Sequence, residues 1–280
     1  MKIPKVIHYC WFGRGKKPEI ALKCIESWKK ILPEYEIIEW NEDNFDVNKN
    51  LYVKQAYENK KYAFVTDYVR LYVLYNYGGV YMDTDVEVLK PLDEFLKHPA
   101  FSGFENNNSV PTGLMAAQKK NKWIKDLLSE YDDLEFVKED GSFDLTTNVV
   151  RITNLTEKKY GLEKKSSYQE LKNTVVFYHY DYFCPKDWFS GKINLTSNSV
   201  TIHHFNGSWH SKQEKKCLQK RVKYVNKYGV EEGNKKYQKY LHQLKILKLL
   251  FLPIKCFLHP VKAFKRLKKI VNNKKGKNYE

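Results

Sequence analysis

The sequence predicts an α/β domain with a mainly parallel central sheet and flanking helices, followed by a helical, basic C-terminal region. Strand-like and helix-like apolar patterns alternate through most of the first 211 residues, which is typical of a doubly wound sheet. The charge then changes abruptly, since residues 212–280 hold 21 of the 49 basic side chains but only 4 of the 33 acidic ones. Residues 1–211 keep 28 basic and 29 acidic side chains, so we expect a near-neutral domain there and a separate basic region over residues 212–280.

Local patterns predict the elements of the first domain in order. An apolar run predicts a buried first strand that ends at Gly13, and helical spacing from residue 19 stops at Pro33. A second helix ends at Gly78 and Gly79, the usual position of glycine after a helix. The expected strands are residues 5–12, 35–40 and 80–88, with four more near residues 101, 115, 175 and 201. The expected helices are residues 19–32, 63–77 and 124–131.

Composition narrows the class of protein. Hydrophobic residues make up 42% of the 280, which is ample for a packed core. The five cysteines are widely spaced and include no Cys-x-x-Cys pair, which favours reduced thiols over a disulfide framework or a zinc site. The N-terminal segment lacks the apolar run of a signal peptide, and no stretch reaches the roughly 20 apolar residues of a spanning helix. We therefore expect a cytoplasmic protein.

Two carboxylates stand at the end of the expected strand 80–88. In the segment YMDTD, Asp83 and Asp85 are two residues apart, so on a strand both would project from the same face. Ligands of α/β proteins bind at the carboxyl ends of the strands. Two hard oxygen ligands suit a magnesium- or manganese-type cation, which would stabilise the charge on a diphosphate leaving group. The alternative is a solvated strand end with no ligand.

Asp67 and Arg70 are three residues apart on the expected helix 63–77, so they would share one face. One interpretation is an exposed ion pair worth a few tenths of a kcal/mol. The other is a polar clamp on sugar hydroxyls and phosphate, because this helix leads directly into the strand that carries Asp83 and Asp85.

Three motifs in order carry a family resemblance: IPKVIHYCWFG, then FVTDYVRLYVLYNYGGVYMDTDVEVLKPLD, then YFCPKDWFSGKINLTSNSVTIHHFNGSWH. Over residues 1–210 the chain resembles glycosyltransferase family 32, the sugar-binding regions that contain a DXD motif. Its last motif is similar to the bacterial capsular polysaccharide branch, which is related to the catalytic domains of large glucosylating toxins. The resemblance implies a GT-A fold, a UDP-sugar donor, Mn²⁺ or Mg²⁺, and retention of anomeric configuration.

The resemblance also implies roles for individual residues. Trp11 would stack on uracil, although it could equally be a core aromatic. Asp67 and Arg70 would hold the donor sugar, and Asp83 would contact ribose, sugar and metal. The remaining donor-binding candidates are Tyr77, Ser208 and Trp209, and Asn148 is a further candidate beside the anomeric carbon.

For the metal, the resemblance implies Asp85 as a direct ligand, with Asp83 and His204. His203 is the alternative to His204, since adjacent strand residues face opposite ways and only one of them can point inward. Either histidine could instead be purely structural. With these ligands the expected reaction is transfer of a hexose (galactose, glucose or an N-acetylated hexose) to a saccharide acceptor. A non-catalytic carbohydrate- or nucleotide-binding protein with a structural cation is the alternative.

The basic region lies outside the resemblance. Residues 244–258 and 261–271 alternate apolar and basic side chains, which is typical of an amphipathic helix on an anionic membrane surface. We therefore expect attachment to the inner face of the cell membrane and a lipid-linked acceptor in surface or capsular polysaccharide synthesis. A helical hairpin packed on the catalytic domain and a nucleic-acid-binding tail are the alternatives, and the apolar face argues against the latter.

Overall fold

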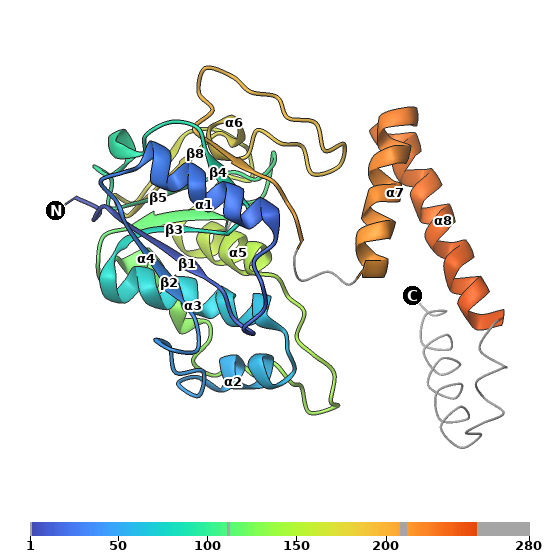
Figure 1. The fold of residues 1–280 in the computed structure, drawn as a ribbon, viewed down its shortest axis with the longest axis horizontal. Coiled ribbons are helices and arrows are strands. Elements are labelled where there is room, and N and C mark those ends of the chain that lie inside the picture. Colours follow the sequence, from blue (N-terminus) through green and yellow to red (C-terminus); the bar gives the residue numbers. More distant parts are fainter. Residues whose placement is uncertain (1, 111–112, 208–211, 251–280) are drawn as a thin grey trace. The chain divides into compact units, whose positions relative to one another are not determined.

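The computed structural model describes residues 2–110, 113–207 and 212–250. The chain forms two compact units, Met1–His210 and Ser211–Glu280. The first unit is built on a sheet with helices on both faces, and the second contains two long helices (Figure 1).

The sheet of the first unit has seven described strands in the order β2-β1-β3-β6-β5-β8-β7. β1 is parallel to β2 and β3, and β5 is parallel to β8, whereas β6 and β7 run in the opposite direction. The bounds are β1 Val6–Cys10, β2 Glu36–Trp40, β3 Gly79–Met82, β5 Ala100–Gly103, β6 Leu114–Ala117, β7 Gln169–Leu171 and β8 Val175–Tyr178. Most strands therefore point the same way, and the predicted fold class is confirmed.

Helices cover both faces of this sheet (Figure 1). Their bounds are α1 Glu19–Ile31, α2 Leu51–Glu58, α3 Tyr62–Tyr77, α4 Lys122–Ser129, α5 Asn148–Tyr160 and α6 Tyr180–Phe183, with a 3₁₀ turn at Asp93–Phe95. Alternate side chains of a strand enter opposite cores. Ile7 and Val80 pack in the core that contains Trp28 of α1, whereas Cys10 and Tyr81 pack in the core formed with α3. The side chains of β3 that face α3, Tyr81 among them, thus lie on the side of the sheet where the candidate site is found.

The expected strand 80–88 is not continuous. β3 ends at Met82, and β4 (Val86–Val88) leaves the large sheet to pair with β9 (Thr201–His203) in a second, antiparallel sheet. Asp83, Thr84 and Asp85 form the turn between them, closed by the Val86 N–H, which donates to the Asp83 carbonyl over 3.0 Å. The prediction that Asp83 and Asp85 share one face of a strand is wrong, because the chain has to turn there to reach its second partner.

Four elements were not expected from the sequence: α2, α5, α6 and β7. The reason is clearest for α5, whose buried positions include Asn148, Thr153 and Thr156 beside Ile152. Polar residues at core positions conceal the apolar period that identifies a helix. The helix ends at Gly161, which has the left-handed φ of 82° that favours glycine after a helix.

The second unit contains α7 (Lys212–Tyr228) and α8 (Val230–Leu250), joined at Gly229. The helices approach closely where Gly233 lies, since a Cβ on Gly233 would be 2.6 Å from the Cα of Val225. The expected segment 261–271, and residues 251–258 of the segment 244–258, lie outside the described residues. Among the residues that are described, no helix is long and apolar enough to cross a membrane.

Candidate active site

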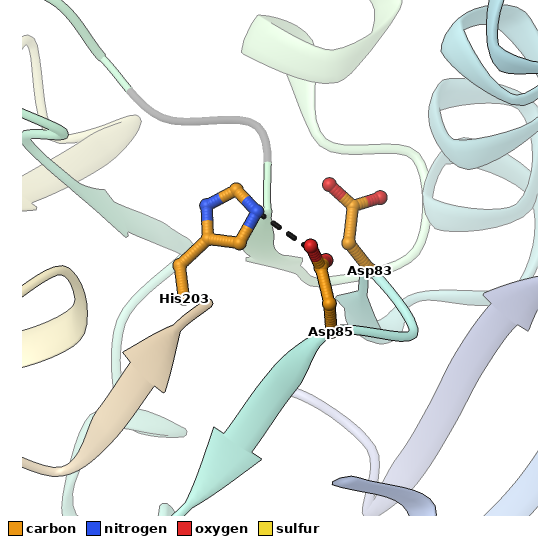
Figure 2. Close-up of side chains that lie close together, drawn as sticks. All are labelled: Asp83, Asp85 and His203. Atoms are coloured by element: carbon orange, nitrogen blue, oxygen red, sulfur yellow. Dashed lines mark ion pairs between the residues drawn. The ribbon is translucent and has the colours of Figure 1, made fainter. Parts of the chain in front are cut away.

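Asp83, Asp85 and His203 converge next to the carboxyl end of β3 (Figure 2). One ligand atom from each side chain lies within 4.8 Å of the other two. The two aspartates come from the turn after β3, and His203 ends β9, whose pairing with β4 places it opposite Val86. The His203 Nε2 and Asp85 Oδ1 atoms are 3.4 Å apart. Segments 120 residues apart in the sequence therefore meet through one short antiparallel ladder.

These side chains fit a divalent cation. Two carboxylates and an imidazole are ordinary ligands of such ions, and each of the three is only partly buried. Figure 2 shows the imidazole directed toward the Asp85 carboxylate, with the Asp83 carboxylate beside them.

His204 does not join this cluster. Its Nε2 lies 2.7 Å from Glu87 Oε2, and Lys23 approaches the other oxygen of Glu87 at 3.6 Å. Because adjacent strand residues face opposite sides, His204 points away when His203 points inward. The structure thus differs from the expectation that His204 is the third ligand and places His203, the alternative, beside Asp83 and Asp85.

The charges of His203 and Asp85 depend on each other. Burial by itself would lower the pKa of His203, but the Asp85 carboxylate raises it well above its ordinary value. Burial would raise the pKa of Asp85, yet the imidazolium and the N–H of Asn206, which donates to Asp85 Oδ2 over 2.7 Å, lower it to about 2. Without a cation the two side chains therefore form an ion pair, so a cation that binds here replaces a proton on His203.

Arg70 connects α3 to this turn. Its Nη2 is 3.3 Å from Asp67 Oδ1 and 3.2 Å from Asp83 Oδ1, and Arg70 is only 4% exposed. The guanidinium also lies over the ring of Tyr81, 4.6 Å from its centroid. The interpretation of Asp67 and Arg70 as an exposed ion pair is therefore wrong. Both residues are buried, and Arg70 pairs with Asp83 as well as with Asp67.

The surroundings of Asp67 destabilise the charged form of its carboxylate. Burial and the neighbouring Asp83 raise its pKa to about 6, even though Arg70 lowers it. Asn148, at the start of α5, lies against the same residue and donates from Nδ2 to the Asp67 carbonyl over 3.3 Å. The buried Asn148 Oδ1 has no hydrogen-bond partner among the described residues. The structure thus brings Asn148 to the proposed sugar clamp.

Residues 18–102 match the family described as "Glycosyltransferase sugar-binding region containing DXD motif". The family resemblance is confirmed over these residues, which contain the second of the three motifs. The matched segment contains α3 and the turn Asp83-Thr84-Asp85, which is hereafter called the DXD turn. It covers the helix that carries Arg70 but ends well before His203.

Two of the curated relatives match 38% and 48% of the chain. Inositol phosphoceramide mannosyltransferase 3 of Schizosaccharomyces pombe is 33% identical over 118 residues, which are 38% of this chain and 32% of the relative. Mannosyl phosphorylinositol ceramide synthase SUR1 of Saccharomyces cerevisiae is 30% identical over 145 residues, 48% of this chain and 37% of the relative. The chain thus spans about a third of the length of these relatives.

Solved glycosyltransferases are also similar to the chain. The PaToxG glycosyltransferase is 20% identical, with a TM-score of 0.43 and coverage of 56% of this chain and 70% of that one. The galactosyltransferase LgtC is 14% identical, with a TM-score of 0.40 and coverage of 78% and 94%.

Trp11 lies at the same edge of the sheet as the DXD turn, because it follows β1 and β1 is parallel to β3. Its indole N–H donates to the Gly15 carbonyl over 2.6 Å, and Lys17 Nζ is 5.8 Å from the ring centroid. The side chain is only partly buried. The ring also packs against the hydrophobic core, so the stacking role and the alternative of a core aromatic both stay predictions.

Tyr77 is not brought to the DXD turn. It precedes β3 whereas Asp83 follows it, and its ring contacts Trp40 at a centroid distance of 5.3 Å. Tyr81 lies there instead, with its hydroxyl donating to Asp83 Oδ1 over 3.0 Å. Sequence reasoning missed Tyr81, although its position two residues before Asp83 was a usable signal. Ser208 and Trp209 lie outside the described residues.

Proposed function

We propose that this chain is a glycosyltransferase that transfers a hexose from a nucleoside-diphosphate sugar to a saccharide acceptor. The observation that carries the proposal is the DXD turn, which belongs to a matched sugar-binding region and has His203 beside its two carboxylates. A divalent cation bound there would neutralise the charge that develops on the diphosphate leaving group.

The surrounding residues supply positioning and charge. Arg70 and the Tyr81 hydroxyl both contact Asp83 Oδ1, so the direction of this carboxylate is set before a donor binds. Asp67 and Arg70 lie on α3 next to the same turn, where we assign them to the donor sugar, with Asn148 beside them. We assign Trp11 to the base of the nucleotide. We also propose retention of anomeric configuration, as the family resemblance implies.

Donor and acceptor are proposed in the same way. UDP-sugars of galactose, glucose or an N-acetylated hexose come from the family resemblance, and the names of the relatives add mannose. Those names also refer to a ceramide lipid, which supports our proposal of a lipid-linked acceptor. We propose that residues 212–280 attach the enzyme to the inner face of the cell membrane, and that the product serves a surface polysaccharide.

The test is cation-dependent release of nucleoside diphosphate from a panel of UDP-sugars and a nucleotide-linked mannose. Slow donor hydrolysis requires no known acceptor. Asp85→Ala should abolish release, and His203→Ala should raise the Mn²⁺ concentration needed for half-maximal rate by more than about tenfold, since even indirect changes at metal sites reach that size. His204→Ala is the matched control and should stay near wild type.

Near wild-type release by Asp85→Ala at saturating Mn²⁺ would overturn the cation assignment. Tight binding of a nucleotide sugar without any turnover would favour the non-catalytic binding protein instead.

A further inference from the structure

Gly113 lies against both segments that form the candidate cation site, the DXD turn and His203. Its carbonyl accepts the Asp83 N–H over 2.8 Å, so it holds the first residue of the DXD turn. A Cβ built on Gly113 would lie 2.9 Å from Nδ1 and 3.0 Å from Cε1 of His203. Real Cβ atoms rarely come this close to another side chain. Gly113 is buried and precedes β6, the strand that pairs with β3.

Glycine is needed at this position because a side chain would have no room beside the His203 ring. The backbone of Gly113 does not adopt the left-handed φ that would itself exclude other residues. Alanine could adopt this backbone conformation, but its methyl group would press on the imidazole. The same imidazole contacts the Phe205 ring at a centroid distance of 4.2 Å, so it is packed by more than one neighbour.

We propose that Gly113, together with Phe205, is a positioning residue that sets where His203 Nε2 stands relative to the DXD turn. This inference rests on the cation site of the proposed function. Cε1 is bonded to Nε2 and Nδ1 is the next atom of the same rigid ring, so a push on them moves Nε2 relative to Asp85, now 3.4 Å away. Ligand distances at metal sites tolerate only about 0.2 Å, and changes behind a ligand commonly lower affinity by about 10–100-fold.

The experiment measures Mn²⁺ binding to the full-length protein without donor, from the electron paramagnetic resonance signal of free Mn²⁺. Four proteins form a cycle: wild type, Gly113→Ala, His203→Ala and the double variant. Gly113→Ala should bind Mn²⁺ about tenfold more weakly than wild type. In the His203→Ala background the same methyl group meets no imidazole, so it should change the affinity less than about twofold.

Gly103→Ala is the matched control. Its added Cβ would lie 2.7 Å from Cδ2 of Phe183, so the crowding is similar but falls on a residue outside the cation site. This variant should leave the Mn²⁺ affinity within about twofold of wild type even if it lowers stability.

Two results would overturn the positioning role: unchanged Mn²⁺ binding by folded Gly113→Ala, or an equal loss with and without His203. If Gly113→Ala does not fold, Phe205→Leu decides, because it removes a ring contact rather than adding atoms. Phe205→Leu should weaken binding only while His203 is present, and unchanged binding would refute the role. A wild-type protein that binds no Mn²⁺ would overturn the cation site itself, and with it this inference.

Discussion

Asp67 should lower the stability of the protein at neutral pH, and replacing it with asparagine should reveal this. Asparagine has nearly the same shape and no charge, and Arg70 keeps Asp83 as a partner 3.2 Å away. We expect Asp67→Asn to unfold at higher urea concentration than wild type at pH 7.5, while it loses use of the sugar donor. A residue that costs stability and is needed for a ligand is common at functional sites.

The magnitude follows from the pKa of Asp67. Burial raises it from 3.8 to about 6, although Arg70 opposes the change. The folded state then binds the proton more tightly than the unfolded chain, so stability falls as pH rises through the window between these values. A shift of about two units corresponds to about 3 kcal/mol. Asp67→Asn should therefore gain up to about 3 kcal/mol at pH 7.5, and this advantage should vanish near pH 4.

The assay is urea unfolding followed by tryptophan fluorescence at several pH values. Residues 212–280 contain no tryptophan, so the signal does not come from α7 or α8; the described tryptophans all belong to the first unit and are Trp11, Trp28, Trp40, Trp123 and Trp188. The control is Asp43→Asn, which removes an exposed carboxylate paired with Arg14 and should leave the pH dependence of wild type almost unchanged.

Two results would refute a destabilising Asp67: an Asp67→Asn that is less stable than wild type at pH 7.5, or a stability difference between the two proteins that does not depend on pH. A less stable Asp67→Asn would mean that the attraction between Asp67 and Arg70 exceeds the cost of burial, and a pH-independent difference would mean that the two balance.

Other consequences of the site can be measured in the same preparations. Arg70→Met leaves the buried Asp67 and the partly buried Asp83 without the guanidinium they share, and should lower the free energy of unfolding by about 3–5 kcal/mol; a loss below about 1 kcal/mol would contradict this network. Because Asp85 raises the pKa of His203, Mn²⁺ must displace a proton. The affinity of the protein for Mn²⁺ should therefore rise with pH, and a pH-independent affinity would argue against proton displacement. Calorimetry in buffers of different ionisation enthalpy should detect the released proton. A chain that ends at Leu250 should lose binding to anionic vesicles and still hydrolyse donor, whereas equal binding by both chains would exclude residues 251–280 as the anchor.

Local signals were sufficient for the central part of the fold. The glycines that end the helix predict its C-terminal boundary, and the structure places α3, which carries Asp67 and Arg70, at Tyr62–Tyr77. Asp83 and Asp85 were expected to be neighbours and they are, but for a different reason. The expectation relied on strand alternation, whereas the carboxylates meet because β3 ends and the chain turns. Two residues so close in sequence stay close in either geometry.

Long-range pairing accounts for what sequence reasoning missed. Whether His203 or His204 faces the DXD turn depends on the register of β9 against β4, and a shift of one residue would exchange them. Nothing within the segment TIHHF fixes that register, because its partner strand lies more than 100 residues earlier. Gly113 gave no signal for the same reason, since its neighbours are the Asp83 backbone and the His203 ring rather than residues near it in sequence.

The charges at the site explain why a buried acid with a raised pKa and a cation site occur together. Asp67, Asp83 and Asp85 offer three negative charges, which Arg70 and a protonated His203 only partly balance. Burial, together with the nearby Asp83, raises the pKa of Asp67 to about 6, so without a cation this carboxyl keeps its proton only below that pH. A divalent cation adds two positive charges and removes one proton from His203, so these five side chains and the ion reach neutrality with Asp67 ionised. Cation binding should thus lower the pKa of Asp67 below about 6, so that this carboxylate stays an ionised acceptor for sugar hydroxyls over a wider pH range when the donor and its cation are present.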